Sequence, residues 1–136
     1  MILADTSAWV EYDRATGSAV DQRMTQLIRQ DRLLAYTEPV VMEVLAGAHS
    51  DARERDLRRL LLRFHLLGFD AAVDFSAAAR VYRTCRRAGI TPRGLLDCMI
   101  AAVAWRNHAT LLSYDADLYR VAEVMNIDVD QASLRK

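Results

Sequence analysis

Four carboxylate side chains stand among apolar residues, where a charged group is unexpected. Asp5 and Asp115 directly follow the largely apolar runs 1–4 and 111–114, and Glu43 and Asp97 lie inside the apolar stretches 40–45 and 95–100. Burying an isolated carboxylate costs on the order of several kcal/mol unless it is protonated, paired or bound to metal. These acids are therefore the first candidates for chemistry.

Several carboxylates at one place repel one another, and a divalent cation is their natural counter-charge. All-oxygen ligation favours Mg²⁺, or alternatively Mn²⁺, over zinc. Such ions orient and acidify a water molecule and stabilise the charge that develops on a phosphate. No dedicated histidine base is evident, because His49, His65 and His108 are widely spaced. The acids therefore indicate hydrolysis of a phosphodiester bond.

Each acid taken alone has a simpler explanation. Asp5 and Asp97 are typical of residues near a helix start, where a carboxylate complements the helix dipole. Glu43 could be an exposed residue on one side of its helix, and Asp115 could open a turn. Only the joint placement of the four favours a functional site over these explanations.

The elements that must position these acids alternate between strand and helix. This alternation predicts an α/β fold, a three-layer α/β/α arrangement around a central parallel sheet, in a single domain over 1–136. Parallel strands end at one edge of a sheet, and helices that follow them begin there, so we expect the four acids to converge. Strands are expected at 1–4, 33–36, 66–69, 110–114 and, at an edge, 127–129.

Helix starts are marked by capping residues and helix ends by glycine. The expected helices are a short one capped by Thr6 or Ser7, one opened by Ser18 and Asp21, then 40–46 ending at Gly47, one opened by Asp51, one from Asp74 or Ser76 to Gly89, 95–107 and 116–125.

Composition excludes several classes of protein. With 18 cationic and 18 anionic side chains the net charge is zero, which excludes a uniformly basic protein. Residues 51–93 nevertheless carry ten Arg against five acids, and this Arg-rich pair of helices could attract phosphate. Cys85 and Cys98 are expected to be buried free thiols. The longest apolar run, 98–105, is too short for a bilayer, and the first residues lack a signal-peptide pattern, so a cytoplasmic location is expected.

Four segments carry a resemblance to a known family. They are 2–9 (ILADTSAW), 38–47 (EPVVMEVLAG), 96–104 (LDCMIAAVA) and 111–118 (LLSYDADL). They are spread along essentially the whole chain, and they resemble the PIN-domain ribonucleases, in particular the VapC-type toxins of toxin–antitoxin pairs. Tyr114 and Leu118 depart from the residues usual in that family. Neither departure removes a carboxylate, so they concern substrate contacts rather than metal binding.

The resemblance implies a role for each acid. Asp5, Glu43, Asp97 and Asp115 would be the catalytic residues that bind Mg²⁺, with Asp117 as a supporting acid. The implied activity is endonucleolytic cleavage of structured RNA, such as tRNA or rRNA, by metal-activated water. The implied partners are a VapB-type antitoxin, whose tail fills the active-site groove, and a second copy of the chain in a homodimer.

Two further residues are candidate substrate contacts. Ser7 lies beside Asp5, and Arg93, four residues before Asp97, suits a phosphate or an antitoxin carboxylate. Two other function classes stay open. One is a catalytically silent PIN-fold binding module, and the other is a phosphoryl-transfer domain that is phosphorylated on Asp5. The second class needs another acid beside Asp5 and a nearby lysine, and the only lysine is Lys136.

Overall fold

A parallel four-stranded sheet with the order β3-β2-β1-β4 forms the centre of the computed structural model, which describes residues 1–30 and 32–135. In the register of β1 and β4, Ala4 pairs with Leu112. The residues that follow these two, Asp5 and Ser113, therefore leave the sheet at the same level. The strands are β1 (Ile2–Ala4), β2 (Leu34–Tyr36), β3 (His65–Leu66) and β4 (Thr110–Leu112).

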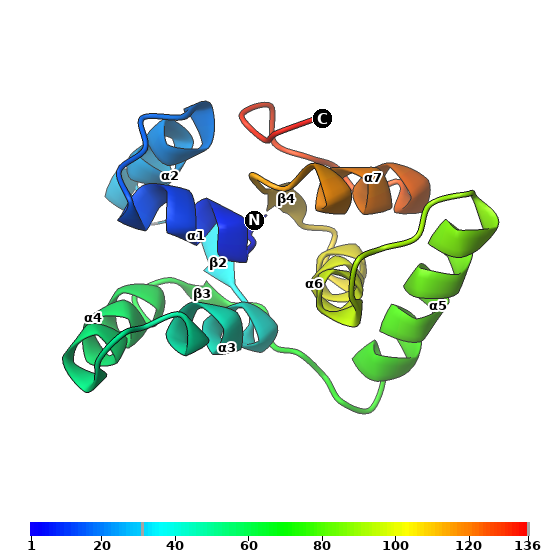
Figure 1. Cartoon of the computed structure of the whole chain (residues 1–136), viewed down its shortest axis with the longest axis horizontal. Helices are drawn as coiled ribbons and strands as arrows, with labels where there is room; N and C mark the ends of the chain where they lie inside the picture. Colours follow the sequence, from blue (N-terminus) through cyan, green and yellow to red (C-terminus); the bar gives the residue numbers. More distant parts are fainter. Residues whose placement is uncertain (31, 136) are drawn as a thin grey trace.

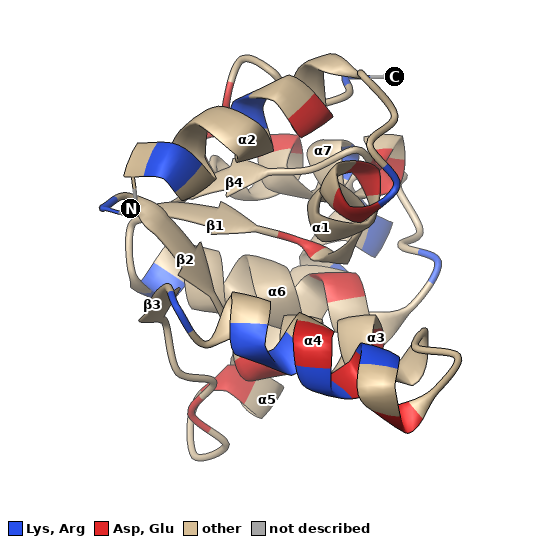
Figure 2. Ribbon diagram, turned by 90° about the vertical axis from the view of Figure 1, so that its left-hand side faces the viewer, with Lys and Arg blue, Asp and Glu red and all other residues tan. Residues whose placement is uncertain are grey.

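Helices cover the sheet and extend beyond both of its ends. The sheet lies between α2 above and α6 below in Figure 2, which agrees with the predicted α/β fold with a central parallel sheet. In Figure 1, α5, α6 and α7 pack together at one end of the molecule, and α4 lies at the other end beyond α3. The helices are α1 (Thr6–Asp13), α2 (Ala19–Gln30), α3 (Glu38–Ala46), α4 (Asp51–Leu61), α5 (Asp74–Arg87), α6 (Leu95–Arg106) and α7 (Ala116–Met125).

The core explains why the central elements are so apolar. Residues 100–104 of α6 are all buried, as its nearly continuous apolar sequence predicts, and β1, β2 and the end of β4 are buried as well. Cys85 and Cys98 are free and buried, as predicted. Gly89 has a φ of +85° just beyond α5, a conformation that side chains rarely adopt, so this glycine ends the helix.

Three local predictions are wrong. The cap of α1 is Asp5, not Thr6 or Ser7, because the strand ends at Ala4 and the helix begins without an intervening loop. The third strand comprises His65–Leu66 rather than 66–69, since the chain pairs with β2 only briefly before it turns away. The segment 127–129 forms no strand but a single bridge between Val129 and Leu111.

The remaining element boundaries differ from the predictions by a few residues. Ser18 does open α2, since its hydroxyl accepts the Asp21 N–H at 3.1 Å. The Asp21 carboxylate in turn accepts the N–H of Gly17 at 2.9 Å. The predicted pair of residues therefore closes the start of the helix, with the second bond displaced by one residue from a regular capping box.

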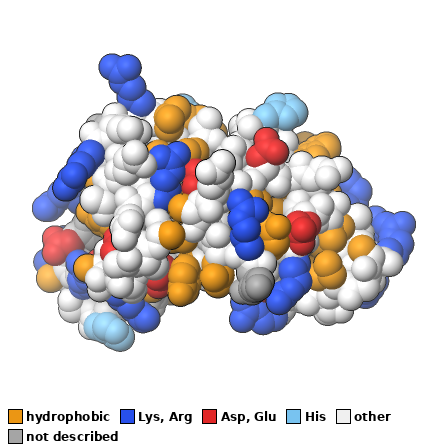
Figure 3. Space-filling view, turned by 90° about the horizontal axis from the view of Figure 1, so that it is seen from above, with side chains coloured by type: hydrophobic (Ala, Val, Ile, Leu, Met, Phe, Trp, Pro, Cys, Tyr) orange, Lys and Arg blue, Asp and Glu red, His pale blue; other side chains and the backbone are white. Residues whose placement is uncertain are grey.

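The expected basic pair of helices does not form one surface. Figure 1 places α4 and α5 at opposite ends of the molecule, so their arginines make two separate groups. Figure 3 likewise shows Lys and Arg side chains spread along the face seen from above rather than gathered in one patch. Lys136, the only lysine of the chain, lies outside the described residues. None of the helices in the described ranges has the length and apolar character that crossing a bilayer requires.

Candidate active site

A cavity of about 360 Å³ lies where β1 and β4 end. Four separate segments of the chain supply its walls: the start of α1, the middle of α3, the start of α6 and the loop between β4 and α7. The structure therefore brings together the four acids that the sequence singles out. The lining residues are Asp5, Thr6, Ser7, Val10, Glu11, Glu43, Asp97, Tyr114 and Asp115.

Asp5 is the most deeply buried of the four acids, with 3% of its surface exposed. Its Oδ1 accepts the Ala8 N–H at 2.9 Å, which caps α1, and the Ser7 hydroxyl at 2.7 Å. Its Oδ2 accepts the Ser113 hydroxyl at 2.7 Å. Burial raises the pKa of the Asp5 carboxyl from 3.8 to about 6, although these hydrogen bonds lower it; the nearby charge of Asp115 raises it further.

Glu43 reaches the cavity from the middle of α3 rather than from its first turn. The helix begins at Glu38 with Pro39 in its first turn, as predicted for that proline. The Thr6 hydroxyl donates a hydrogen bond to Oε1 of Glu43. This bond joins α1 to α3 directly at the cavity and fixes the position of one carboxylate oxygen.

Asp115 caps α7 while it lines the cavity. Its Oδ1 accepts the Asp117 N–H at 2.9 Å, and its own N–H donates to the Ser113 hydroxyl at 3.0 Å. Ser113 thereby links two acids, because the same hydroxyl donates to Asp5. The N–H of Tyr114 donates to Ser7 at 2.7 Å, so the loop after β4 is fixed from both sides.

Among the four acids, Asp97 shows the effect of the neighbouring carboxylates on its pKa most clearly. Burial is the largest cause that raises its pKa from 3.8 to about 7, and the charges of the other acids, Asp115 first, raise it further. Its helix follows α5 and not a strand, so the reason for expecting it at this edge was wrong. Packing of α6 against α3, α5 and α7 places its first turn here instead.

Arg93 contacts the acids themselves. Its Nη2 lies 2.7 Å from Oδ1 of Asp115 and its Nε 3.6 Å from Oδ2 of Asp117, and its side chain is 71% exposed. The Arg93 N–H also donates to Asp117 at 3.1 Å. Asp117 is absent from the cavity wall, and its observed contacts are with this loop and with Arg120. Arg93 thus neutralises part of the acidic cluster from the solvent side.

The donor set fits a hard divalent cation. Among the described residues, several carboxylate oxygens make no protein hydrogen bond: both of Asp97, Oε2 of Glu43 and Oδ2 of Asp115. Asp5 uses three of the roughly four lone-pair directions of a carboxylate. Within residues 1–30 and 32–135, however, no three His, Cys, Asp or Glu side chains are already grouped as ligands.

The comparison with known families decides the identity of the fold. The model of the PIN domain matches residues 2–124. The chain belongs to the PIN domain family. Ribonuclease VapC11 of Mycobacterium tuberculosis and VapC ribonuclease Mb1587 of Mycobacterium bovis are each 45% identical to it over 128 residues, 93% of this chain and 96% of the relative. This identity places the chain in the VapC branch of the family and bears out the resemblance in the sequence.

Solved structures agree on the PIN fold. VapBC2 of Rickettsia felis, bound to a promoter DNA fragment, aligns with a TM-score of 0.74 at 16% identity over 98% of this chain and 99% of that one. FitAcB of Neisseria gonorrhoeae aligns with a TM-score of 0.72 at 21% identity over 97% and 98%. These neighbours are too distant in sequence to show more than the fold.

The sequence did not predict the roles of several residues in this PIN-domain cavity. Thr6 and Ser113 position acids through their hydroxyls, and Glu11 lines the cavity as a fifth acid one turn after Ser7. Glu11 could have been found from the sequence, since position 11 shares a helix face with position 7. The Thr6 and Ser113 contacts link residues 37 and 108 positions apart, and no local pattern reports such pairs.

Proposed function

We propose that this chain is a metal-dependent endoribonuclease that acts as the toxin of a VapBC-type toxin–antitoxin pair. The observation that carries the proposal is the meeting of four carboxylates from four segments in one cavity, with the pKa of Asp97 raised to about 7. Such a cluster is unfavourable without cations, and it has the ligands of an enzyme that cleaves phosphodiesters. The names of the VapC relatives support ribonuclease activity.

The proposed cation is Mg²⁺, with Mn²⁺ as the alternative. Asp5, Glu43, Asp97 and Asp115 would hold it through their remaining oxygens, and Asp117 would support them through the Arg93 loop. When bound, the cation would lower the pKa of a water and stabilise charge on the phosphate. Because no histidine among the described residues lines the cavity, one of the acids or a hydroxide held by the cation would have to take the proton of the attacking water.

The hydroxyls around the cavity would keep the acids in place during the reaction. Ser113 holds Asp5 and the N–H of Asp115, and Thr6 holds Glu43. These bonds determine which oxygens face the cavity and which are occupied. The proposed role of Ser7 changes accordingly, since its hydroxyl is engaged with Asp5 and Tyr114 and it orients them rather than substrate.

Phosphorylation of Asp5 is disfavoured by its surroundings. Both of its oxygens accept hydrogen bonds, and the side chain is almost fully buried. An in-line attack on a phosphoryl donor needs an exposed carboxylate oxygen with a free approach. A catalytically silent binding module is the remaining alternative, and only activity distinguishes it from the proposed enzyme.

Purified protein and an RNA substrate test the proposal directly. Wild type should cleave total tRNA or rRNA in Mg²⁺ or Mn²⁺, and EDTA should stop the reaction. Asp5→Asn and Asp97→Asn should reduce cleavage at least about 100-fold, as expected when a metal ligand is lost. Asp128→Asn, an exposed acid away from the cavity, is the matched control and should cleave normally. Full activity of Asp97→Asn, in a preparation free of other nucleases, would refute the four-acid site.

The proposed substrate and partners need separate experiments. Sequencing RNA 5′ ends after induced expression of wild type and of Asp5→Asn should reveal cleavage sites in tRNA or rRNA that only wild type produces. Co-expression with a neighbouring small open reading frame should yield a stable complex without nuclease activity if that frame encodes a VapB-type antitoxin. Light scattering of the toxin alone should give the mass of a homodimer.

A further inference from the structure

A second hollow of about 290 Å³ adjoins the catalytic cavity, between α1, α3 and α4. Val10 and Glu43 line both spaces, so the two are adjacent at that point. We propose that this hollow, the α1–α3–α4 groove, binds the nucleotide next to the scissile phosphate, with Arg14 pairing with the phosphate of that nucleotide. The inference rests on the proposed ribonuclease function and names a part of its substrate site.

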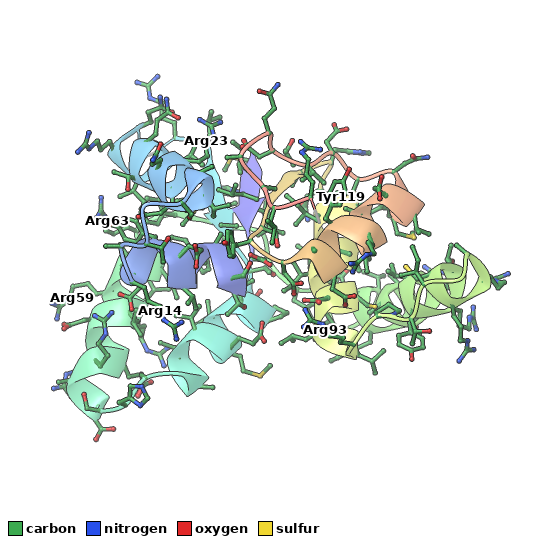
Figure 4. All side chains as sticks on the ribbon, turned by 45° about the horizontal axis from the view of Figure 1, so that its top comes forward. Arg14, Arg23, Arg59, Arg63, Arg93 and Tyr119 are labelled. Atoms are coloured by element: carbon green, nitrogen blue, oxygen red, sulfur yellow. The ribbon has the colours of Figure 1, made fainter. Side chains whose placement is uncertain are left out.

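Arg14 is the uncompensated positive charge of this groove. It is exposed, directly follows α1, and forms no ion pair or side-chain hydrogen bond within residues 1–30 and 32–135. Its backbone is fixed, since its N–H donates to the Val10 carbonyl at 2.9 Å. Arg53, which also lines the groove, is instead paired with Asp13. In Figure 4, Arg14 lies below α1 on the α4 side, whereas Arg93 lies on the far side of the cavity near α6.

Charge explains why the substrate would use this groove. The catalytic cavity is rich in carboxylates, which repel the phosphates that flank the cleaved bond. The guanidinium of Arg14, in the groove that Glu43 also lines, offers those phosphates a partner. Arg93 is less available for this role, because Asp115 and Asp117 already hold its guanidinium.

The floor of the groove suits a base or a sugar. Trp9, Val44 and Leu57 line it with apolar surface, and Trp9 packs against Phe64 with ring centroids 5.8 Å apart. The indole N–H of Trp9 is buried without a partner among the described residues. An unpaired buried donor is unfavourable, but a base or sugar oxygen would reach it only after the side chains that cover it shift. Single-stranded RNA presents such groups, together with an unstacked base, at each nucleotide.

The test replaces Arg14 with Gln in the full-length protein and measures cleavage of a short single-stranded oligoribonucleotide that contains a mapped cleavage site. We expect KM to rise about tenfold with kcat within twofold of wild type, because the contact positions substrate away from the reacting atoms. The slope of log KM against log salt concentration should fall by about 0.7, the value for one phosphate contact on a single strand. Arg14→Lys should restore the slope.

Matched controls separate this effect from general charge. Arg87→Gln removes another exposed arginine, at the end of α5, and should leave KM and the salt slope unchanged. Two series of substrates, shortened from the 5′ or the 3′ side, locate the contact. In one of the two series, shortening removes the nucleotide that binds in the groove. From that length on, Arg14→Gln and wild type should have the same KM.

The outcomes also separate this proposal from the underlying function. If wild type cleaves RNA and Arg14→Gln keeps the wild-type KM and salt slope, the groove does not bind RNA, although the ribonuclease proposal stands. The same conclusion follows if the Arg14→Gln defect persists in both shortened series. If Arg14→Gln instead weakens only the binding of an antitoxin peptide, the groove docks protein. If wild type cleaves no RNA, the function itself fails, and binding of the oligonucleotide by Asp97→Asn with and without Arg14→Gln still tests the groove.

Discussion

Asp97→Asn should stabilise the cation-free protein at neutral pH while it abolishes cleavage. The Asp97 carboxyl has a pKa of about 7 in the folded protein against an ordinary value of 3.8, raised by burial and by the neighbouring carboxylates. At about 1.36 kcal/mol per pKa unit, this difference corresponds to roughly 4 kcal/mol of destabilisation when Asp97 is charged. Asn has a similar shape and carries no charge, so it removes the repulsion.

The expected gain is smaller than that upper value. Asp97 is partly exposed, which screens its interactions, and a buried amide needs hydrogen bonds of its own. We therefore expect Asp97→Asn to raise the free energy of unfolding by about 1–2 kcal/mol near pH 8. For a domain of this size that is a rise in Tm of roughly 3–8 °C.

The sign of the pH dependence follows from the raised pKa. Between about pH 4 and pH 7 the folded state binds more protons at Asp97 than the unfolded state does, so wild-type stability falls as pH rises through this window. Asn does not titrate. The stability advantage of the variant should therefore be near zero at the acid end of this window, grow as pH rises and level off above pH 7.

Thermal unfolding followed by circular dichroism in EDTA, at pH 5, 6, 7 and 8, measures this difference. Asp128→Asn should match wild type within about 0.5 kcal/mol at each pH, as surface substitutions do. Adding Mg²⁺ should raise the Tm of wild type by mass action and that of Asp97→Asn much less. An Asp97→Asn protein that is no more stable than wild type at pH 8, or whose advantage is the same at pH 5, would refute the electrostatic reasoning.

Three further substitutions address the residues around the acids. Ser113→Ala removes a hydrogen bond that lowers the pKa of Asp5, so the acid limb of the profile of kcat/KM against pH should move upward, by less than the change at Asp5 because the pKa of Asp97 is higher; an unchanged limb would contradict this role. Arg93→Gln frees Asp115 from an exposed ion pair and should tighten Mn²⁺ binding up to about fivefold by calorimetry; weaker binding would show that Arg93 helps to form the site. Tyr114→Ala removes an exposed ring at the cavity and should raise KM for RNA about 5- to 100-fold if a base stacks there, while Tyr114→Phe should retain the wild-type KM.

The local sequence pattern predicted most of the strands and helices of this protein. The apolar runs before Asp5 and Asp115 predicted two strands, because a strand buried on both faces has few polar residues. In the structure these two strands pair with each other. Helix positions followed from Pro39 and from the capping pair at Ser18 and Asp21. Register then made convergence of the strand-end acids almost unavoidable, since parallel strands finish at one edge.

The features that were missed depend on packing between distant segments. Asp97 enters the cavity because α6 packs against α5, α7 and α3, and not because a strand precedes it. The Arg-rich stretch 51–93 divides between opposite ends of the molecule for a similar reason. Spacing along the chain reports which residues share an element. It does not report which elements become neighbours when several helices compete for the faces of a short sheet.

The simple and the functional explanations of the acids prove to be compatible. Asp5 and Asp115 are both helix N-caps, so each has a structural role. In both residues a single oxygen, Oδ1, accepts the capping N–H. That bond fixes the carboxylate plane and leaves Oδ2 outside the cap. Capping contributes about 0.5–2 kcal/mol per helix, which offsets part of the cost of placing a charged side chain beside other carboxylates. The local role that made each acid look unremarkable is therefore what orients it in the cavity.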